Sequence, residues 1–216
     1  GTQEYQLTIF LSGPTPTPTP TPEPKAPVPQ EGRPLAEIPV AQREDLYNTP
    51  PAMYLDTTKA YQATLETDKG NIVMDLDAAL APISVNNFVT LANLGYYDGM
   101  PVAYVDLNTY FVSGSPAKTP DSDVGYTLPV EPAAAAKPIV AGAVAMYPVT
   151  VAAVGGATAV AASGSQFFVA YTAIPSGATP LNIFGQVTAG LDIAQTLVAD
   201  DIITMITITE RPRWSD

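Results

Sequence analysis

Residues 163–169 read Ser-Gly-Ser-Gln-Phe-Phe-Val, a small polar turn that leads directly into an apolar run. Aromatic and β-branched residues favour strands, so residues 166–171 are predicted as a buried strand. This strand lies within the longest uncharged stretch of the chain, residues 138–191. A single strand is not stable in water, so the run also predicts sheet partners elsewhere in the sequence.

Further strands are predicted on both sides of this run, at residues 61–67, 71–76, 102–112, 141–147, 183–187 and 202–209. Residues 82–94 predict an amphipathic helix, with Pro82 in its first turn and Gly95 just after its end. Residues 191–198 predict a second, shorter helix. Strands dominate and helices are few, which favours a mainly β fold, a barrel with helical caps.

The N-terminal quarter of the chain has a different composition. Residues 1–12 alternate as a strand does, and residues 14–22 repeat Pro-Thr. Alternate prolines predict a polyproline-II linker, whose threonines are candidate sites for O-linked glycans. The predicted organisation is therefore an N-terminal strand (1–12), a Pro/Thr-rich linker and irregular segment (13–58), and a globular domain (59–216). Within the irregular segment, residues 41–47 predict a short turn of helix.

The composition excludes several classes of function. Nine Lys+Arg against 21 Asp+Glu give a net charge of −12, which argues against nucleic acid or an anionic membrane surface as a partner. Without Cys or His, the chain has no thiolate nucleophile, no imidazole base and neither of the commonest zinc ligands. We expect no metal and no cofactor. The uncharged stretch is interrupted by Pro and Gly too often to be a membrane-spanning helix.

From residue 61 onward the chain resembles the cyclophilin-type peptidyl-prolyl cis-trans isomerases. The matching segments keep the family's order, and they are residues 66–73, 81–89, 95–99, 125–129, 163–169 and 183–187. The Gly-Ser-Gln-Phe-Phe run is the most specific of them. The resemblance implies an eight-stranded antiparallel barrel capped by two helices, which agrees with the strand pattern.

The resemblance also implies an active site, and there the sequence departs from the family. The family's arginine, whose guanidinium polarises the prolyl amide, falls on Tyr104. No arginine lies between Arg43 and Arg211, so we expect the groove to lack a cation. The family's pocket phenylalanine, methionine and glutamine fall on Thr109, Tyr110 and Val112, and its histidine falls near Leu181.

A residual groove is predicted from Gln166, Phe168 and Met146, with Phe111 added if the alignment contains a short gap. Pro148, in the segment that follows Met146, cannot donate a backbone hydrogen bond. Tyrosine at position 104 cannot replace a guanidinium that stays charged at every accessible pH. We therefore expect proline isomerisation to be lost or nearly lost. The competing interpretation is weak activity through apolar desolvation alone.

Several other groups invite a functional interpretation. The pairs Asp75/Asp77 and Asp121/Asp123 have the spacing of cation ligands, although a solvated strand end and a polar turn are the favoured interpretations. The aromatic residues could grip a peptide or a sugar, but core and interface packing is favoured; they are Tyr96, Tyr97, Tyr104, Tyr110 and Phe111. An uncharged insertion at residues 149–162 predicts a loop buried against another subunit.

The leading hypothesis from the sequence is structural. A linker over residues 14–29 reaches about 50 Å when extended, far enough to carry the first strand to a neighbouring copy. The chain would then be an exported, extracellular filament subunit, a head-to-tail homopolymer. The strand would anchor through Tyr5, Leu7, Ile9, Phe10 and Leu11. The alternatives are an extracytoplasmic isomerase on a Pro-Thr tether and a non-catalytic module that binds proline-containing peptides.

Overall fold

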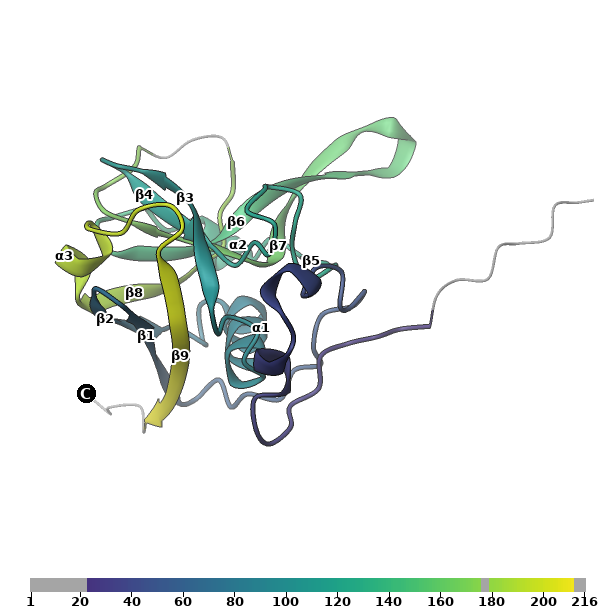
Figure 1. Cartoon of the computed structure of the whole chain (residues 1–216). Helices are drawn as coiled ribbons and strands as arrows, with labels where there is room; N and C mark the ends of the chain where they lie inside the picture. Colours follow the sequence, from purple (N-terminus) through teal and green to yellow (C-terminus); the bar gives the residue numbers. More distant parts are fainter. Residues whose placement is uncertain (1–22, 176–178, 212–216) are drawn as a thin grey trace, which may run out of the picture.

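The computed structural model describes residues 23–175 and 179–211 (Figure 1). The predicted N-terminal strand and the Pro-Thr repeat lie outside the described residues. The anchor residues Tyr5, Leu7, Ile9, Phe10 and Leu11 are therefore outside them as well.

Eight antiparallel strands close into a barrel, as the sequence predicts. They follow the order β4-β3-β9-β1-β2-β8-β6-β7, the pairing of β4 with β7 closes the ring, and β5 adds to β7. The barrel strands are β1 (Ala60–Thr67), β2 (Gly70–Leu76), β3 (Met100–Asp106), β4 (Tyr110–Ser113), β6 (Ala143–Ala152), β7 (Thr158–Ala170), β8 (Ile183–Ala189) and β9 (Ile202–Arg211). The short strand β5 is Thr127–Leu128.

Buried side chains alternate with more exposed ones along β1 and β2, which pair as a hairpin. Ala63 and Leu65 are fully buried and point into the barrel, opposite Met74 and Ile72 of β2. The connection is tight because Gly70 adopts φ +129°, a conformation that L side chains rarely reach. Each fully buried aliphatic side chain contributes about 1.5–3 kcal/mol, so the inward face of this hairpin fixes its register.

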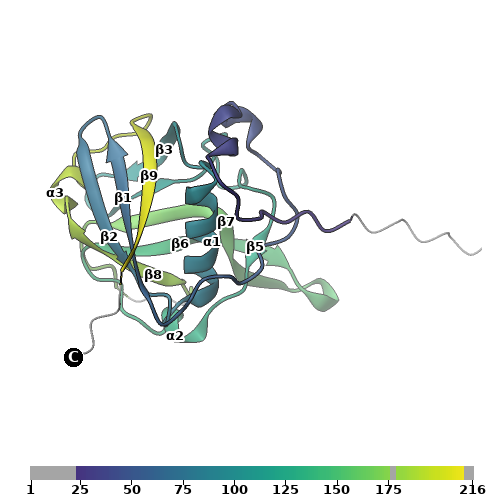
Figure 2. The same ribbon diagram turned by 90° about the horizontal axis from the view of Figure 1, so that it is seen from below.

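Helix α1 (Pro82–Asn93) packs across one end of the barrel, in contact with β7 and β9 (Figure 2). Its Phe88 ring lies 5.4 Å from that of Phe167 and 5.2 Å from that of Phe184, measured between ring centroids. The residue before the helix is Ala81, which cannot cap it. The Glu131 carboxylate caps the helix instead, accepting hydrogen bonds from the backbone N–H groups of residues 83 and 84 at 2.8 and 3.0 Å.

The other helices are single turns. They are α2 (Pro132–Ala135) and α3 (Leu191–Ala194), so the predicted helix at 191–198 is shorter than expected. Two 3-10 turns, Pro34–Glu37 and Val40–Gln42, take the place of the helical turn predicted at 41–47.

Residues 33–48 form a strap that lies against the barrel and α1. The buried Arg43 guanidinium donates hydrogen bonds to the carbonyl oxygens of Ile38, Tyr96 and Asp98 at 2.8, 2.7 and 2.6 Å. Arg33 adds two hydrogen bonds to the Asp98 carboxylate, at 2.6 and 2.5 Å. The predicted boundary between residues 58 and 59 stays a prediction, but the strap is ordered and attached to the domain.

Two segments differ from the sequence prediction. The strand expected at 102–112 is divided into β3 and β4, because Asp106 accepts hydrogen bonds at its side chain from Asn108 and at its carbonyl from Thr109, which form a turn. The insertion at 149–162 is an extension of β6 and β7 rather than a loop. The two strands stay paired from Pro148 and Ala162 out to Ala152 and Thr158, as an arm that projects from the barrel (Figure 1).

Candidate functional site

Two adjoining cavities open on the outer wall formed mainly by β3, β4, β6 and β7. One has a volume of about 340 Å³, and we call it the polar cavity because Lys118, Thr119 and Gln166 line it, although most of its wall is apolar. The other, the apolar cavity, has a volume of about 210 Å³, and Tyr110 and Tyr147 line both. We call the two together the groove. The polar cavity is also lined by Ala103, Tyr104, Val112, Lys118, Thr119, Pro120 and Gln166. The apolar cavity is completed by Ile139, Pro148, Phe168, Ile174, Thr179 and Leu181.

Alternation along β4 and β7 decides which side chains reach the groove. Tyr110 and Val112 of β4 face outward, and Val112 pairs in register with Phe168 of β7. The Phe168 ring lies 5.5 Å from the Tyr110 ring and is only 5% exposed. Val112 and Phe168 belong to a second apolar layer, separate from the barrel core, against which Tyr110 packs. Its other members are Ile139, Ala143, Ala145, Ala170 and Ile183.

The structure places two of the predicted groove residues elsewhere. Phe111 and Met146 are fully buried in the barrel core. Residues next to each other on a strand face opposite sides of the sheet, so Phe111 points inward. Its ring centroid lies 6.4 Å from that of Phe167. Met146 is inward for the same reason, and its neighbour Tyr147 is the residue that lines the groove.

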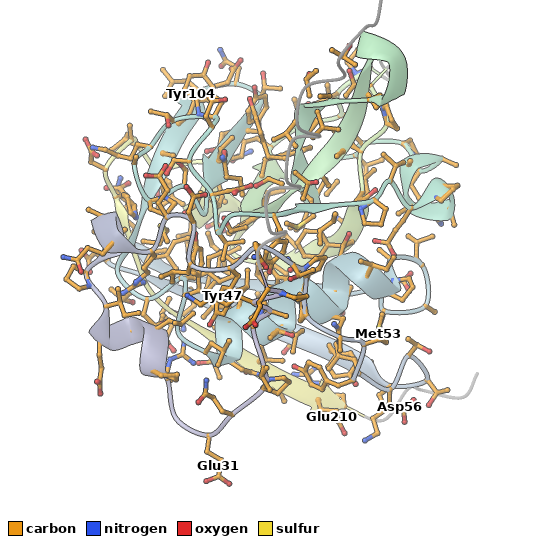
Figure 3. All side chains as sticks on the ribbon, turned by 90° about the vertical axis from the view of Figure 1, so that its right-hand side faces the viewer. Glu31, Tyr47, Met53, Asp56, Tyr104 and Glu210 are labelled. Carbon is orange, nitrogen blue, oxygen red and sulfur yellow. The ribbon has the colours of Figure 1, made fainter. Side chains whose placement is uncertain are left out.

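Tyr104, at the position of the family's arginine, lies at the surface on β3 and is 54% exposed (Figure 3). It lines the polar cavity, and its ring centroid is 6.1 Å from that of Tyr110. Burial raises the pKa of Tyr110, so its hydroxyl stays protonated and uncharged near neutral pH. Thr109, aligned with the pocket phenylalanine, lies in the turn before β4 and lines neither cavity.

Gln166 lines the polar cavity, but its amide group holds a loop in place. The side chain is 2% exposed, and Nε2 donates to the carbonyl oxygens of Pro120 and Ser122 at 2.8 and 3.1 Å. In the same loop, Ser115 Oγ donates a hydrogen bond to the carbonyl oxygen of Thr119 and accepts one from its backbone N–H. Gln166 is therefore a positioning residue for residues 115–122.

That loop brings a cation to the groove, which corrects the expectation that none is present. Lys118 lines the polar cavity, and its Nζ lies 2.6 Å from Asp200 Oδ1. The expectation considered only arginines at aligned strand positions. The lysine comes instead from a loop whose path depends on Gln166, so local sequence gives no signal for it.

The aromatic cluster proposed from the sequence is divided by the barrel wall. Tyr96 and Tyr97 are fully buried in the core, where burial raises the pKa of both hydroxyls. Phe111 also lies in the core, so only Tyr104 and Tyr110 of the five face the groove. Tyr147, Ile139 and Ile174 also line the groove, although no sequence motif marks them as groove residues.

One residue of each acidic pair accepts a hydrogen bond from a protein side chain. Asp75 accepts a hydrogen bond from Gln62 Nε2 at 2.8 Å, and Asp123 accepts one from Ser163 Oγ at 2.8 Å. Within residues 23–175 and 179–211, no three Asp or Glu side chains gather as a candidate metal site. Over the same ranges, no helix has the length and apolar character that crossing a membrane requires.

Comparison with known proteins agrees with this architecture. The family model of cyclophilin type peptidyl-prolyl cis-trans isomerases matches residues 62–212. The chain belongs to this family. A peptidyl-prolyl cis-trans isomerase of Helicobacter pylori is 31% identical over 153 residues, which cover 70% of this chain and 88% of that protein. Peptidyl-prolyl cis-trans isomerase B of Bacillus subtilis is 31% identical over 141 residues, covering 65% and 92%.

Solved structures share the fold of this cyclophilin domain. A cyclophilin type isomerase of Cryptosporidium parvum superposes with a TM-score of 0.58 at 21% identity, covering 71% of this chain and 99% of that one. A second structure of that protein, determined in the presence of the dipeptide Ala-Pro, gives a TM-score of 0.55 at 22% identity, covering 68% and 98%.

These relatives overturn the filament hypothesis. The matched proteins are isomerases, and no comparison points to a filament subunit. The length of a Pro-Thr linker limits how far a strand can reach. Strand addition also needs an exposed sheet edge on the neighbouring copy, which the linker does not provide.

Proposed function

We propose that this cyclophilin domain binds proline-containing peptides in the groove and accelerates rotation about the X–Pro bond, at a rate limited by the absence of a guanidinium at position 104. The observation that carries the proposal is the apolar cavity, which lies between Phe168, Tyr110 and Leu181. A proline ring is apolar and compact, and these walls would exclude water from it. The Cryptosporidium parvum structure obtained with Ala-Pro supports the same class of ligand.

The chemistry follows from the electronic structure of the amide. Resonance makes the planar X–Pro bond polar and gives it a rotation barrier of about 18–20 kcal/mol, whereas the twisted transition state has lost that resonance. Apolar surroundings disfavour the more polar planar form, which lowers the barrier. Tyr110, Tyr147 and Phe168 provide such surroundings without any proton transfer.

The expected rate is modest because a positioned cationic donor is missing. Removing one preorganised donor from an enzyme costs about 10²–10³ in kcat. Tyr104 has a phenol hydroxyl in place of the guanidinium, and the residue is 54% exposed. Uncatalysed X–Pro rotation takes tens to hundreds of seconds, so even a small acceleration is measurable.

NMR exchange spectroscopy on a short X–Pro peptide tests the proposal. We expect the protein to increase the exchange rate, and we expect Leu181→Glu to abolish the increase by placing a charge on the apolar wall. Leu181 is partly exposed, so this change does not hollow the core. Val140→Glu is the matched control, because Val140 is 44% exposed and lines neither part of the groove.

Two results would contradict the proposal. The first is an exchange rate equal to that of the free peptide, with no chemical-shift changes around the groove. The second is an equal loss of activity in Leu181→Glu and Val140→Glu, which would place the activity outside the groove.

A further inference from the structure

We infer that Lys118 makes the groove selective for peptides that carry an acidic side chain next to the proline. The inference rests on the proposed function, because it needs a proline-containing peptide in the groove. It assigns a specificity role to a residue at which the sequence pattern gave no signal.

The two cavities adjoin each other. Tyr110 and Tyr147 form a wall common to both, whereas Lys118 lines only the polar cavity. Consecutive Cα atoms of a peptide are 3.8 Å apart, so a proline in the apolar cavity places a neighbouring residue at the polar one. Lys118 therefore faces the neighbour of the proline and not the proline ring.

Hydrogen bonds within its loop fix the backbone position of Lys118. Gln166 Nε2 is bonded to the loop backbone, and Ala117 N donates to Ser122 Oγ at 2.9 Å. Lys118 itself has φ +59°, an uncommon conformation for a residue with a side chain. A non-glycine residue in this conformation persists only where the surrounding contacts enforce it, as they do here.

The Lys118 ammonium can donate to a second carboxylate in addition to that of Asp200. Its pairing with Asp200 is solvent-exposed, with side-chain exposures of 46% for Lys118 and 69% for Asp200. Such exposed pairs are weak, and an ammonium has three donors, so a peptide carboxylate can share or displace Asp200 at little cost. Asp200 does not line the groove and so does not occupy the place of the ligand.

Lys118 sets the charge of the groove lining. Of the described residues that line the groove, only Lys118 is charged. The net charge of −12 repels acidic peptides in general, but salt screens exposed charges beyond about 8 Å at physiological ionic strength. Inside the groove, the nearby lysine therefore decides the preference.

Binding and isomerisation of six peptides, in three pairs, test the inference. The peptides differ only in the residue next to proline, which is Glu, Gln or Lys, and each is made with that residue before and after the proline. At physiological ionic strength we expect the wild-type protein to bind a Glu peptide about 1.5-fold to fivefold more tightly than the Gln peptide, the range for an exposed ion pair. Lys118→Gln should remove this preference, and Lys118→Glu should transfer it to the Lys peptide.

Two further variants sharpen the test. Asp200→Asn frees the ammonium from its competitor and should increase the preference for Glu. Lys69→Gln is the matched control, because Lys69 Nζ forms an equivalent 2.6 Å ion pair with the neighbouring Asp201 but lines neither cavity. Its Glu-to-Gln ratio should equal that of the wild-type protein.

The outcomes separate this inference from the proposed function. Equal affinities for Glu and Gln peptides in the wild-type protein overturn the role of Lys118 and leave the proposed function standing. If no peptide binds, the proposed function fails and the inference fails with it. If Lys118→Gln slows isomerisation of the Gln peptide as much as that of the Glu peptide, Lys118 acts on the amide itself and the specificity role is wrong.

Discussion

Restoring a guanidinium at position 104 is the most direct perturbation of the proposed chemistry. Tyr104 lines the polar cavity on β3, in register with Val112 of β4. An arginine there can extend along the cavity toward Tyr110, whose ring is 6.1 Å from that of Tyr104. Its charge would favour the transition state, in which the prolyl nitrogen lone pair has left resonance and can accept a hydrogen bond.

The expected gain in kcat/KM depends on how exposed position 104 is. A fully preorganised donor contributes about 10²–10³ in kcat. At a position that is 54% exposed, solvent screening reduces this contribution. We therefore expect Tyr104→Arg to raise kcat/KM by about tenfold to a hundredfold, which corresponds to about 1.4–2.7 kcal/mol.

NMR exchange spectroscopy with a neutral X–Pro peptide measures this gain. Tyr104→Gln is the control, since it removes the ring without adding charge, and its rate should stay within about threefold of wild type. A rate for Tyr104→Arg no higher than that for Tyr104→Gln would refute the reasoning that this groove lacks only a cation near the amide.

The remaining predictions concern stability. Arg43→Met should lower the free energy of unfolding by about 3–5 kcal/mol in urea titrations, because it leaves buried carbonyl oxygens without their donor. Tyr171→Phe should stabilise the protein by up to about 1 kcal/mol, since the buried Tyr171 hydroxyl has no hydrogen-bond partner among the described residues. Tyr126→Phe should instead destabilise it by about 1–3 kcal/mol, because the Tyr126 hydroxyl donates to Asn87 Oδ1 at 2.7 Å. Burial raises the pKa of Tyr171 to about 12, and also raises that of Tyr96 and Tyr97. Since these tyrosines stay protonated in the folded state while unfolded ones ionise near pH 10, stability should be full below about pH 10 and fall as pH rises toward 12, by up to about 1.4 kcal/mol per pH unit for each. Urea titrations that show no decline over this range would contradict the last prediction.

Periodicity predicted most of the barrel because its strands bury one face each. In β1, the alternation of Ala63 and Leu65 with polar residues leaves one register that hides the apolar side chains. The prediction at 102–112 was wrong because the backbone N–H of Asn108 donates a hydrogen bond to the Asp106 side chain and so forms a turn within a run that otherwise reads as a strand.

The groove was harder to predict because its residues come from separate elements. Phe168 could be located from its motif, but Ile139 and Ile174 meet through an isolated bridge between two loops. Lys118 depends on hydrogen bonds from Gln166, which is 48 positions away, to the adjoining loop residues. Phe111 was assigned to the groove although the strand turns it inward, which is the error that a shift of one residue produces.

The strap also bears on the order of folding. Arg33 Nη2 donates to the carbonyl oxygen of Ile206 at 3.1 Å, and the two residues are 173 positions apart. Strand β1 likewise pairs with β9 near the other end of the domain. Contacts of such long sequence separation form late, because loop closure must come before they stabilise anything. On a ribosome, the strap and β1 would therefore wait for β9 to be synthesised, and the barrel would close as one of the last events of folding.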